Sequence, residues 1–347
     1  MANELRILSC LDRPPSGGEP LSLFRSKASP QTSFTRLFFT TDIHGSEPAF
    51  NKFLNAAGHY KAGILVLGGD ITGKMMISVI RQADGWEAYL FGDRMTAATE
   101  HEVGGLENVI RTNGFYPYRT SPDEVEELEA DPQRVDALFS QLMKESVARW
   151  VQMAEDKLGG SGVKIYISLG NDDRDDIIPV LEQSQVVTYP DGKVVALDDK
   201  HEMASVGYGN MTPWKCPRDL PEVELAGKIA EAVSQVRHMA SCIFNFHVPP
   251  YDTDLDLAPE LDADLRPVLV GGQPSIVPVG STAVRQAIEQ YQPLAGLHGH
   301  VHESRGVTTI GRTVCLNPGS EYSEGVLRGV LLNLKEGRLL SHQFVSG

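Results

Sequence analysis

The sequence predicts an α/β fold, and three observations lead to that prediction. Short, nearly continuous apolar runs recur along the 347 residues, as is typical of strands buried on both faces of a sheet. Between several of these runs, apolar residues repeat every three or four positions, which is typical of helices. Polar motifs rich in Asp, His and Gly stand where five of the runs end, and open α/β sheets place their sites at such strand ends.

The apolar runs are the candidate strands. In chain order they cover residues 36–40, 63–67, 164–169, 241–246, 294–298, 307–310, 313–316 and 326–334. The first five carry the polar motifs, and the last three are separated by Gly311-Arg312 and by the turn 317–320. Residues 12–34, which come before all of them, are rich in Pro, Gly and Ser, so we expect an irregular lead-in there.

The clearest helical pattern covers residues 124–158. Asp131-Pro132 should divide it, with Asp131 as the cap of a new helix and Pro132 at the first helical position. Two further helices are predicted over residues 223–240 and 281–291.

A long excursion separates Asp70 from Asn171, since about a hundred residues is far more than one strand-to-helix connection needs. We predict a helical insertion over residues 75–160, inside a single domain that spans residues 1–347. A lid or an oligomer contact is one interpretation of this insertion, and additional structural packing is the other.

Composition narrows the function classes. The formal charge of −15 argues against a general nucleic-acid binder, because such binding depends mostly on lysine and arginine. Four scattered cysteines without a C-x-x-C motif favour a reduced, cytoplasmic chain. The first twenty residues lack a basic start followed by an apolar stretch, so we expect no signal peptide. No run approaches the roughly 20 apolar residues that cross a bilayer, so we expect no membrane partner.

Five polar motifs carry the candidate site. In order they are Asp42-Ile43-His44-Gly45, Gly68-Gly69-Asp70, Gly170-Asn171-Asp172-Asp173, His247-Val248-Pro249-Pro250 and Gly299-His300-Val301-His302. As ligands they would supply two carboxylates, four imidazoles and one amide, a mixture that divalent metals of intermediate hardness accept. Alone, each motif is no more than a polar turn; together and in order, they predict a metal centre.

The ordered set of motifs resembles that of the calcineurin-like (binuclear) metallophosphoesterases over residues 37–321. Its pattern is D-x-H, G-G-D, G-N-x-D, H and G-H-x-H, and it is most similar to that of the prokaryotic phosphodiesterase-like members. The resemblance implies a four-layer αββα sandwich of two mixed sheets. It also implies a hydrolase of phosphoric esters that uses a hydroxide activated by two divalent metals (Mn, Fe, Zn or Ni) bridged by Asp70. One metal would be held by Asp42, His44, Asp70 and His302, and the other by Asp70, Asn171, His247 and His300.

The third motif departs from the commonest family pattern, because Asp172 follows the asparagine where many members have histidine. We expect Asp172 and His300 to contribute to catalysis. An ionised Asp172 would repel a doubly charged monoester more than a singly charged diester, which favours a phosphodiesterase. In the alternative, Asp172 turns away and caps a helix over residues 176–182, in competition with Asp173 and Asp175.

Other interpretations stay open. Segment 207–214 resembles a loop near the metal crevice of prokaryotic relatives, or it is an ordinary turn that packs one tryptophan. His298 is expected to be buried and is not a candidate ligand. The chain could also be a non-catalytic scaffold, a phosphomonoesterase or, against its acidity, a nuclease. The expected partner is a small phosphate ester, and a homo-oligomer is compatible with the sequence.

Overall fold

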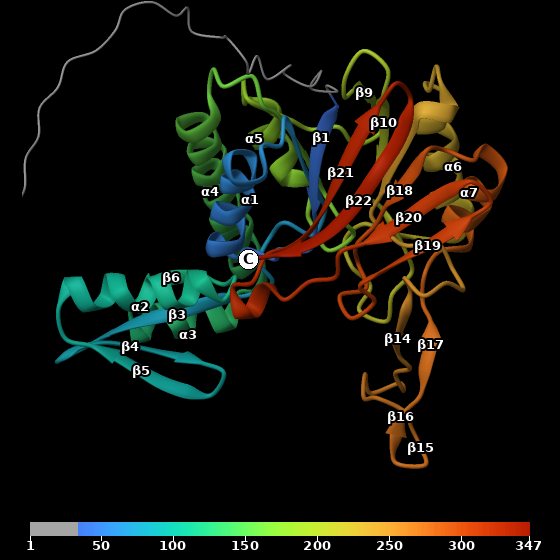
Figure 1. Cartoon of the computed structure of the whole chain (residues 1–347). Helices are drawn as coiled ribbons and strands as arrows, with labels where there is room; N and C mark the ends of the chain where they lie inside the picture. The colour runs from blue at the N-terminus through green and yellow to red at the C-terminus, as the bar shows by residue number, and fades with distance from the viewer. Residues whose placement is uncertain (1–33) are drawn as a thin grey trace, which may run out of the picture. The chain divides into compact units, whose positions relative to one another are not determined.

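The computed structural model describes residues 34–347, which form one compact unit (Figure 1). Residues 12–33 of the expected lead-in lie outside this range. Among the helices of residues 34–347, none combines the length and the apolar character that a membrane crossing requires.

The first of two six-stranded mixed sheets has the order β22-β21-β1-β2-β7-β8. Its strands are β1 (Thr35–Thr40), β2 (Ile64–Gly68), β7 (Lys164–Ser168), β8 (Val187–Thr188), β21 (Arg328–Lys335) and β22 (Arg338–Ser346). Strands β1, β2, β7 and β8 are parallel, and β21 and β22 run antiparallel to their neighbours. The sequence did not predict β22, because this edge strand is mostly exposed and lacks a continuous apolar run.

The second sheet has the order β19-β20-β18-β13-β10-β9. Its strands are β9 (Val194–Ala196), β10 (Glu202–Val206), β13 (Cys242–Phe246), β18 (Ala295–Leu297), β19 (Gly306–Ile310) and β20 (Thr313–Asn317). The four central strands are parallel, and the edge strands β9 and β19 are antiparallel.

Alternation of side chains along the strands produces the layers. Leu37 and Phe39 of β1 pack with Ile243 of β13 in a core between the two sheets, whereas Phe38 points to the helices outside. Helices α1 (Glu47–Tyr60), α4 (Pro132–Leu158) and α5 (Ile178–Glu182) cover the first sheet, and α6 (Glu222–Val233) and α7 (Thr282–Tyr291) cover the second. The α/β fold class and the four-layer αββα sandwich are thereby confirmed.

Of the three helix predictions, two agree with the structure at the predicted helix start, and the third is too long. The Asp131 carboxylate accepts hydrogen bonds from the backbone N–H groups of Gln133 and Arg134 and so caps α4, which begins at Pro132. Ser281 caps α7. The helix predicted over 223–240 is too long: α6 ends at Val233, and a short 3-10 turn, η2 (Met239–Ser241), follows. The apolar residues Val236 and Met239 still pack against the same core, so the apolar pattern continued beyond the end of the helix.

The prediction of a helical insertion over residues 75–160 needs correction. Its first part is a four-stranded sheet of order β5-β4-β3-β6, formed by β3 (Met76–Gln82), β4 (Gly85–Leu90), β5 (Asp93–Ala97) and β6 (Tyr116–Thr120). Helix α2 (Glu100–Thr112) packs on this sheet, and α3 (Pro122–Ala130) follows it. Strand β3 (MISVIRQ) alternates in burial and does contain a nearly apolar run, which the sequence analysis overlooked. Strands β4, β5 and β6 mix polar and apolar residues and show no continuous apolar run. Helix α4 belongs to the main core, where Trp150 stacks on Phe50 of α1.

Short ribbons complete the chain. They are β11 (Gly209–Asn210) with β12 (Asp219–Leu220), β14 (Leu257–Pro259) with β17 (Ile276–Pro278), and β15 (Leu269–Val270) with β16 (Gln273–Pro274). Two 3-10 turns, η1 (Asp175–Ile177) and η3 (Tyr322–Glu324), lie in connecting loops. Residues 257–278, here called the arm, extend away from the second sheet (Figure 1).

Candidate metal centre

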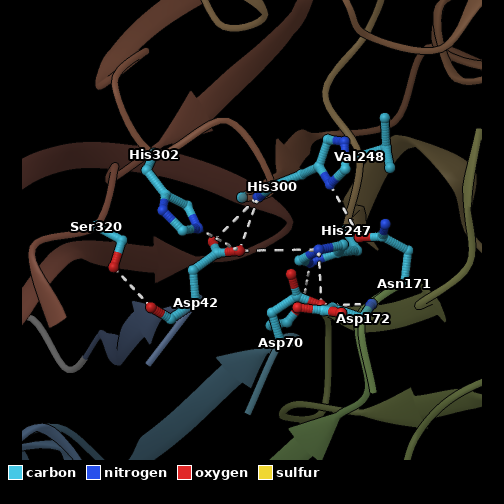
Figure 2. A network of polar contacts seen from close by, with 12 residues as sticks. Asp42, Asp70, Asn171, Asp172, His247, Val248, His300, His302 and Ser320 are labelled. Atoms are coloured by element: carbon cyan, nitrogen blue, oxygen red, sulfur yellow. Dashed lines mark hydrogen bonds and ion pairs between the residues drawn. The ribbon is translucent and has the colours of Figure 1, made fainter. Parts of the chain in front are cut away.

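The five motif loops meet at one edge of the sandwich (Figure 2). They follow β1, β2 and β7 of the first sheet and β13 and β18 of the second, all strands that run parallel to a neighbour. Parallel strands end at the same edge of a sheet, and the packing of the two sheets brings the two edges together.

The first group of candidate ligands is Asp42, His44 and His302, whose ligand atoms lie within 4.8 Å of one another. Nε2 of His44 lies 3.1 Å from Nε2 of His302, which in turn lies 3.6 Å from Oδ1 of Asp42. Asp42 and His44 are buried, and His302 is partly exposed.

The second group is Asp70, His247 and His300, again with ligand atoms within 4.8 Å of one another. Oδ1 of Asn171 lies 2.9 Å from Nδ1 of His300, so the amide oxygen joins this group. All seven candidate ligands therefore come together, divided as the sequence resemblance implies. Their role as ligands stays a prediction.

Asp70 lies between the two groups. Its Oδ1 is 3.4 Å from Nε2 of His247, and its Oδ2 is 3.7 Å from Nε2 of His44. One carboxylate oxygen therefore faces each group, as a bridging ligand requires.

The orientation of His247 fits a metal. Its Nδ1 lies 3.1 Å from the carbonyl oxygen of Gly68, which can only accept, so Nδ1 carries the proton. Nε2 is then the nitrogen that would offer its lone pair to an ion; it is buried, and no described residue forms a hydrogen bond with it. A backbone carbonyl that fixes the tautomer in this way is usual for a histidine that binds a metal.

Charge in the site favours a cation. Burial alone would raise the pKa of Asp42, but a hydrogen bond with His302 and the nearby histidines outweigh it and lower the pKa to about 2. For His247 the effect of burial has the opposite sign and would lower the pKa, but the charges of Asp70 and Asp42 raise this pKa to about 9. Burial would also raise the pKa of Asp70, but His247, His44 and His300 outweigh it and hold that pKa well below its ordinary value, so both carboxylates are ionised. Without an ion they keep a proton on His247, and a divalent cation would take the place of that proton.

Two other histidines are neutral. The pKa of His44 is lowered to about 3 and that of His300 to about 4, and burial is the largest cause in both cases. Since metals bind the neutral imidazole, these two side chains need not lose a proton before they bind an ion.

The motif loops hold a strained backbone. Four non-glycine residues have left-handed φ angles, namely Asp42 (55°), His44 (37°), Asp70 (48°) and His300 (66°). Such conformations are unfavourable for ordinary side chains and cluster at functional sites. Gly69 has φ 122°, and a Cβ there would lie 2.6 Å from Nδ1 of His247. The second glycine of the G-G-D motif is therefore required by both backbone conformation and space.

Asp172 does not cap a helix, so that alternative is wrong. Its carboxylate forms an ion pair of 2.8 Å with Lys74 and lies 3.9 Å from Nδ1 of His44. The short η1 begins after Arg174 and receives no side-chain cap from the described residues. Sequence analysis missed Lys74, although it follows Asp70 by four positions in the same loop.

Asp173, which was predicted only as a competing cap, ties two motif loops together. Its buried carboxylate accepts hydrogen bonds from the backbone N–H groups of Ile71, Thr72 and Gly170 and from the hydroxyl of Thr72. Burial and the charge of Asp70 raise the pKa of Asp173 to about 6. The final Asp of G-N-x-D therefore holds the loops after β2 and β7 in register.

Asp219 is a further residue that the sequence did not reveal. Its Oδ1 accepts a hydrogen bond of 2.8 Å from the amide nitrogen of Asn171, which turns the amide oxygen toward His300. Its Oδ2 accepts from the N–H and hydroxyl of Thr212 and from the N–H of Cys216. No motif surrounds Asp219, and only the tertiary structure brings it to Asn171.

Segment 207–214 lies beside the centre, and its end lines a cavity of about 660 Å³ that reaches His300. Trp214 is 62% exposed, so the interpretation of a turn that packs one tryptophan is wrong. A role in substrate contact stays a prediction. His298 is buried, as predicted, and its Nδ1 lies 2.8 Å from the carbonyl oxygen of Phe246.

Solved structures similar to this chain agree with the fold. The structure of TT1561 from Thermus thermophilus matches with a TM-score of 0.50 and 13% identity, over 91% of this chain and 99% of that one. Another structure matches with a TM-score of 0.51 and 14% identity over the same shares of the two chains. Likeness at this identity shows the fold alone, and it agrees with the four-layer α/β sandwich of this chain.

Sequence relatives add little. Uncharacterized protein MJ1162 of Methanocaldococcus jannaschii is 28% identical over 151 residues, which is 43% of this chain. The chain spans 61% of the length of that relative. No protein-family model matches the chain.

Proposed function

We propose that this chain is a metal-dependent hydrolase of phosphoric esters. The observation that supports it best is the arrangement of Asp70, with one carboxylate oxygen toward His44 and the other toward His247. Seven oxygen and nitrogen donors in two groups around a shared carboxylate suit two divalent ions.

Asp42, His44, Asp70 and His302 would hold one ion, and Asp70, Asn171, His247 and His300 the other. When bound, two such ions supply Lewis acidity toward phosphate oxygens and lower the pKa of a water molecule. The chain itself contributes two ionised carboxylates and a neutral amide, so that a net positive charge would remain to attract an anionic ester.

Asp172 and Lys74 form a partly exposed ion pair beside the first ligand group. Because Lys74 pairs with Asp172 at 2.8 Å, the charge of Asp172 is largely offset, and its repulsion of a monoester is weaker than the sequence suggested. The same pair supports a catalytic part for Asp172, because its partly exposed carboxylate lies 3.9 Å from His44 and can orient a water near the reacting phosphate.

We propose a phosphodiester as the preferred substrate, since the cavity beside His300 offers room for a second organic substituent. The competing function is a phosphomonoesterase, which the positive charge of Lys74 favours. In the Mn²⁺-loaded enzyme, kcat/KM for bis-p-nitrophenyl phosphate should exceed that for p-nitrophenyl phosphate. A monoester preference of about tenfold or more would overturn the diester proposal and leave the hydrolase standing.

The hydrolase itself is tested by Asp70→Asn and His247→Ala. Each should lower kcat/KM by about 10³-fold, the order of loss when one preorganised group at a reaction centre is removed. The exposed His59 provides the matched control, and His59→Ala should be as active as wild type. Wild type and variants that are equally inert on a broad panel of esters would favour a binding scaffold instead.

A further inference from the structure

The cavity beside His300 has a volume of about 660 Å³, within the range that accommodates small organic ligands. The loop 210–214 forms one wall and the arm forms another, and His300 and Val301 lie where the cavity meets the candidate metal centre. The cavity therefore opens beside the second ligand group.

Large apolar side chains line this space. Trp214 is 62% exposed, Met211 53% and Tyr251 38%, and Leu261 and Pro278 lie opposite on the arm. Apolar groups left uncovered in a concave site beside polar ligands are typical of a binding pocket for an apolar or aromatic group.

The charges in the cavity are all of one sign. Glu222, Glu260 and Glu303 line it, and the described lining residues include neither lysine nor arginine. Glu222 accepts hydrogen bonds from the hydroxyl of Ser281 and from the N–H groups that begin α7, so its carboxylate is held in place. A substituent with its own phosphate or carboxylate would be repelled here, whereas an uncharged or cationic one would not.

Hydrogen bonds hold the walls of the cavity in place. Asp219 fixes Thr212 and Cys216 and, at the same time, orients Asn171 beside His300. The amide nitrogen of Asn210 donates to the carbonyl oxygen of Val279 at the base of the arm, 3.2 Å away. The cavity and the candidate metal centre are therefore parts of one fixed arrangement, and a ligand can contact both.

We propose that this cavity binds one organic substituent of the phosphoester substrate, and that it selects an aromatic or aliphatic group without negative charge. Trp214 and Met211 are the residues that determine this specificity. The inference rests on the proposed phosphoester hydrolase and specifies its substrate class as esters of apolar or cationic alcohols, in preference to nucleoside polyphosphates or other polyanions.

Two non-hydrolysable phosphonates with the same single charge test this proposal on the Mn²⁺-loaded protein. Methyl benzylphosphonate and methyl methylphosphonate differ only in the aryl group. Isothermal titration should show the benzyl compound binding at least about tenfold more tightly, the order that added apolar contact in a pocket provides. A 4-carboxybenzyl analogue should lose most of this advantage.

The variant Trp214→Ala should remove the preference for the benzyl compound and leave the affinity of the methyl compound within about twofold. Because Trp214 is largely exposed, this variant should fold, and Met211→Ala provides a second test. Phe91 is exposed at the turn between β4 and β5, so Phe91→Ala is the matched control and should keep the preference.

The outcomes separate the two proposals. Equal binding of both phosphonates, or an unchanged preference in Trp214→Ala, would overturn the cavity proposal and leave the hydrolase standing. If neither phosphonate binds, the proposed function fails, and phenyltrimethylammonium then tests the cavity alone. Saturable quenching of tryptophan fluorescence that disappears in Trp214→Ala would support the cavity, and its absence would refute it.

Discussion

The two sheets supply different chemistry to the candidate metal centre. Loops of the first sheet provide both carboxylates and the amide, with His44 as their single imidazole, whereas loops of the second sheet provide only imidazoles. The group around Asp42 and the group around His247 each draw on both sheets, because His302 joins Asp42 and His44 while Asp70 joins His247 and His300. A third possible group, His44, Asp70 and Asp172, comes from the first sheet alone. The seven-ligand centre therefore forms only where the two sheets are packed together, and its metal binding and sheet packing should depend on each other.

The largest effect should come from the carboxylate that faces both groups. We expect wild type to retain two divalent ions per chain, His302→Ala to retain about one, and Asp70→Ala to lose most of both. The reason is that Asp70 faces both His44 and His247, whereas His302 belongs to the first group alone. Mass spectrometry of metal content after dialysis measures this, with exposed Asp84→Ala as the control. Two ions retained by Asp70→Ala would contradict the bridging role.

Metal removal should weaken the packing of the two sheets. An ion at about 100 times its Kd adds about 2.7 kcal/mol to the free energy of unfolding if it binds only the folded chain. Urea denaturation with Mn²⁺ and with a chelator should show this difference, and His247→Ala should reduce it. Equal stability under both conditions would show that the ions do not link the sheets.

A smaller effect is expected at Asp219, which belongs to neither group. The variant Asp219→Asn should lower metal affinity by about 10- to 100-fold, as is usual when a residue that orients a ligand is changed. The mechanism is loss of the acceptor that turns the amide of Asn171. Titration calorimetry with Mn²⁺ measures the affinity, and exposed Asp199→Asn is the control. An unchanged affinity would limit Asp219 to holding the loop 212–216.

The smallest effect, on kcat/KM, is expected from Lys74, which pairs with Asp172 beside the first ligand group. Lys74→Ala should lower kcat/KM for p-nitrophenyl phosphate about fivefold more than for the diester, which corresponds to roughly 1 kcal/mol for a partly exposed charge. Loss of the cation leaves Asp172 free to repel the doubly charged substrate. Lys200, also exposed, gives the control variant Lys200→Ala. If both substrates change equally, Lys74 does not discriminate between them.

Local chemistry explains which predictions from sequence were correct. Strands buried on both faces, such as β2, require continuous apolar residues, and Asp131-Pro132 is a start signal that the chain can use without distant contacts. Strands β4, β5, β6 and β22 escaped prediction because partial exposure leaves no such run. Strand β3 has a nearly apolar run and was overlooked inside a region interpreted as helical. Asp173 and Asp172 were open to several interpretations, since a carboxylate in a turn can cap a helix or bind a distant group equally well.

The α/β class and the positions of the motif-bearing strands could be predicted from the chain alone, because each depends on residues that are neighbours in sequence. The seven candidate ligands were named from the resemblance of the five motifs to a known family. Only the tertiary structure decided that Asp70 faces both groups, that Asp219 orients Asn171 and that Lys74 pairs with Asp172. It also created the cavity beside His300 from a loop and an arm that are distant in sequence. The physical reason is that these features are distances between side chains of different loops, and such distances are fixed only when the two sheets pack.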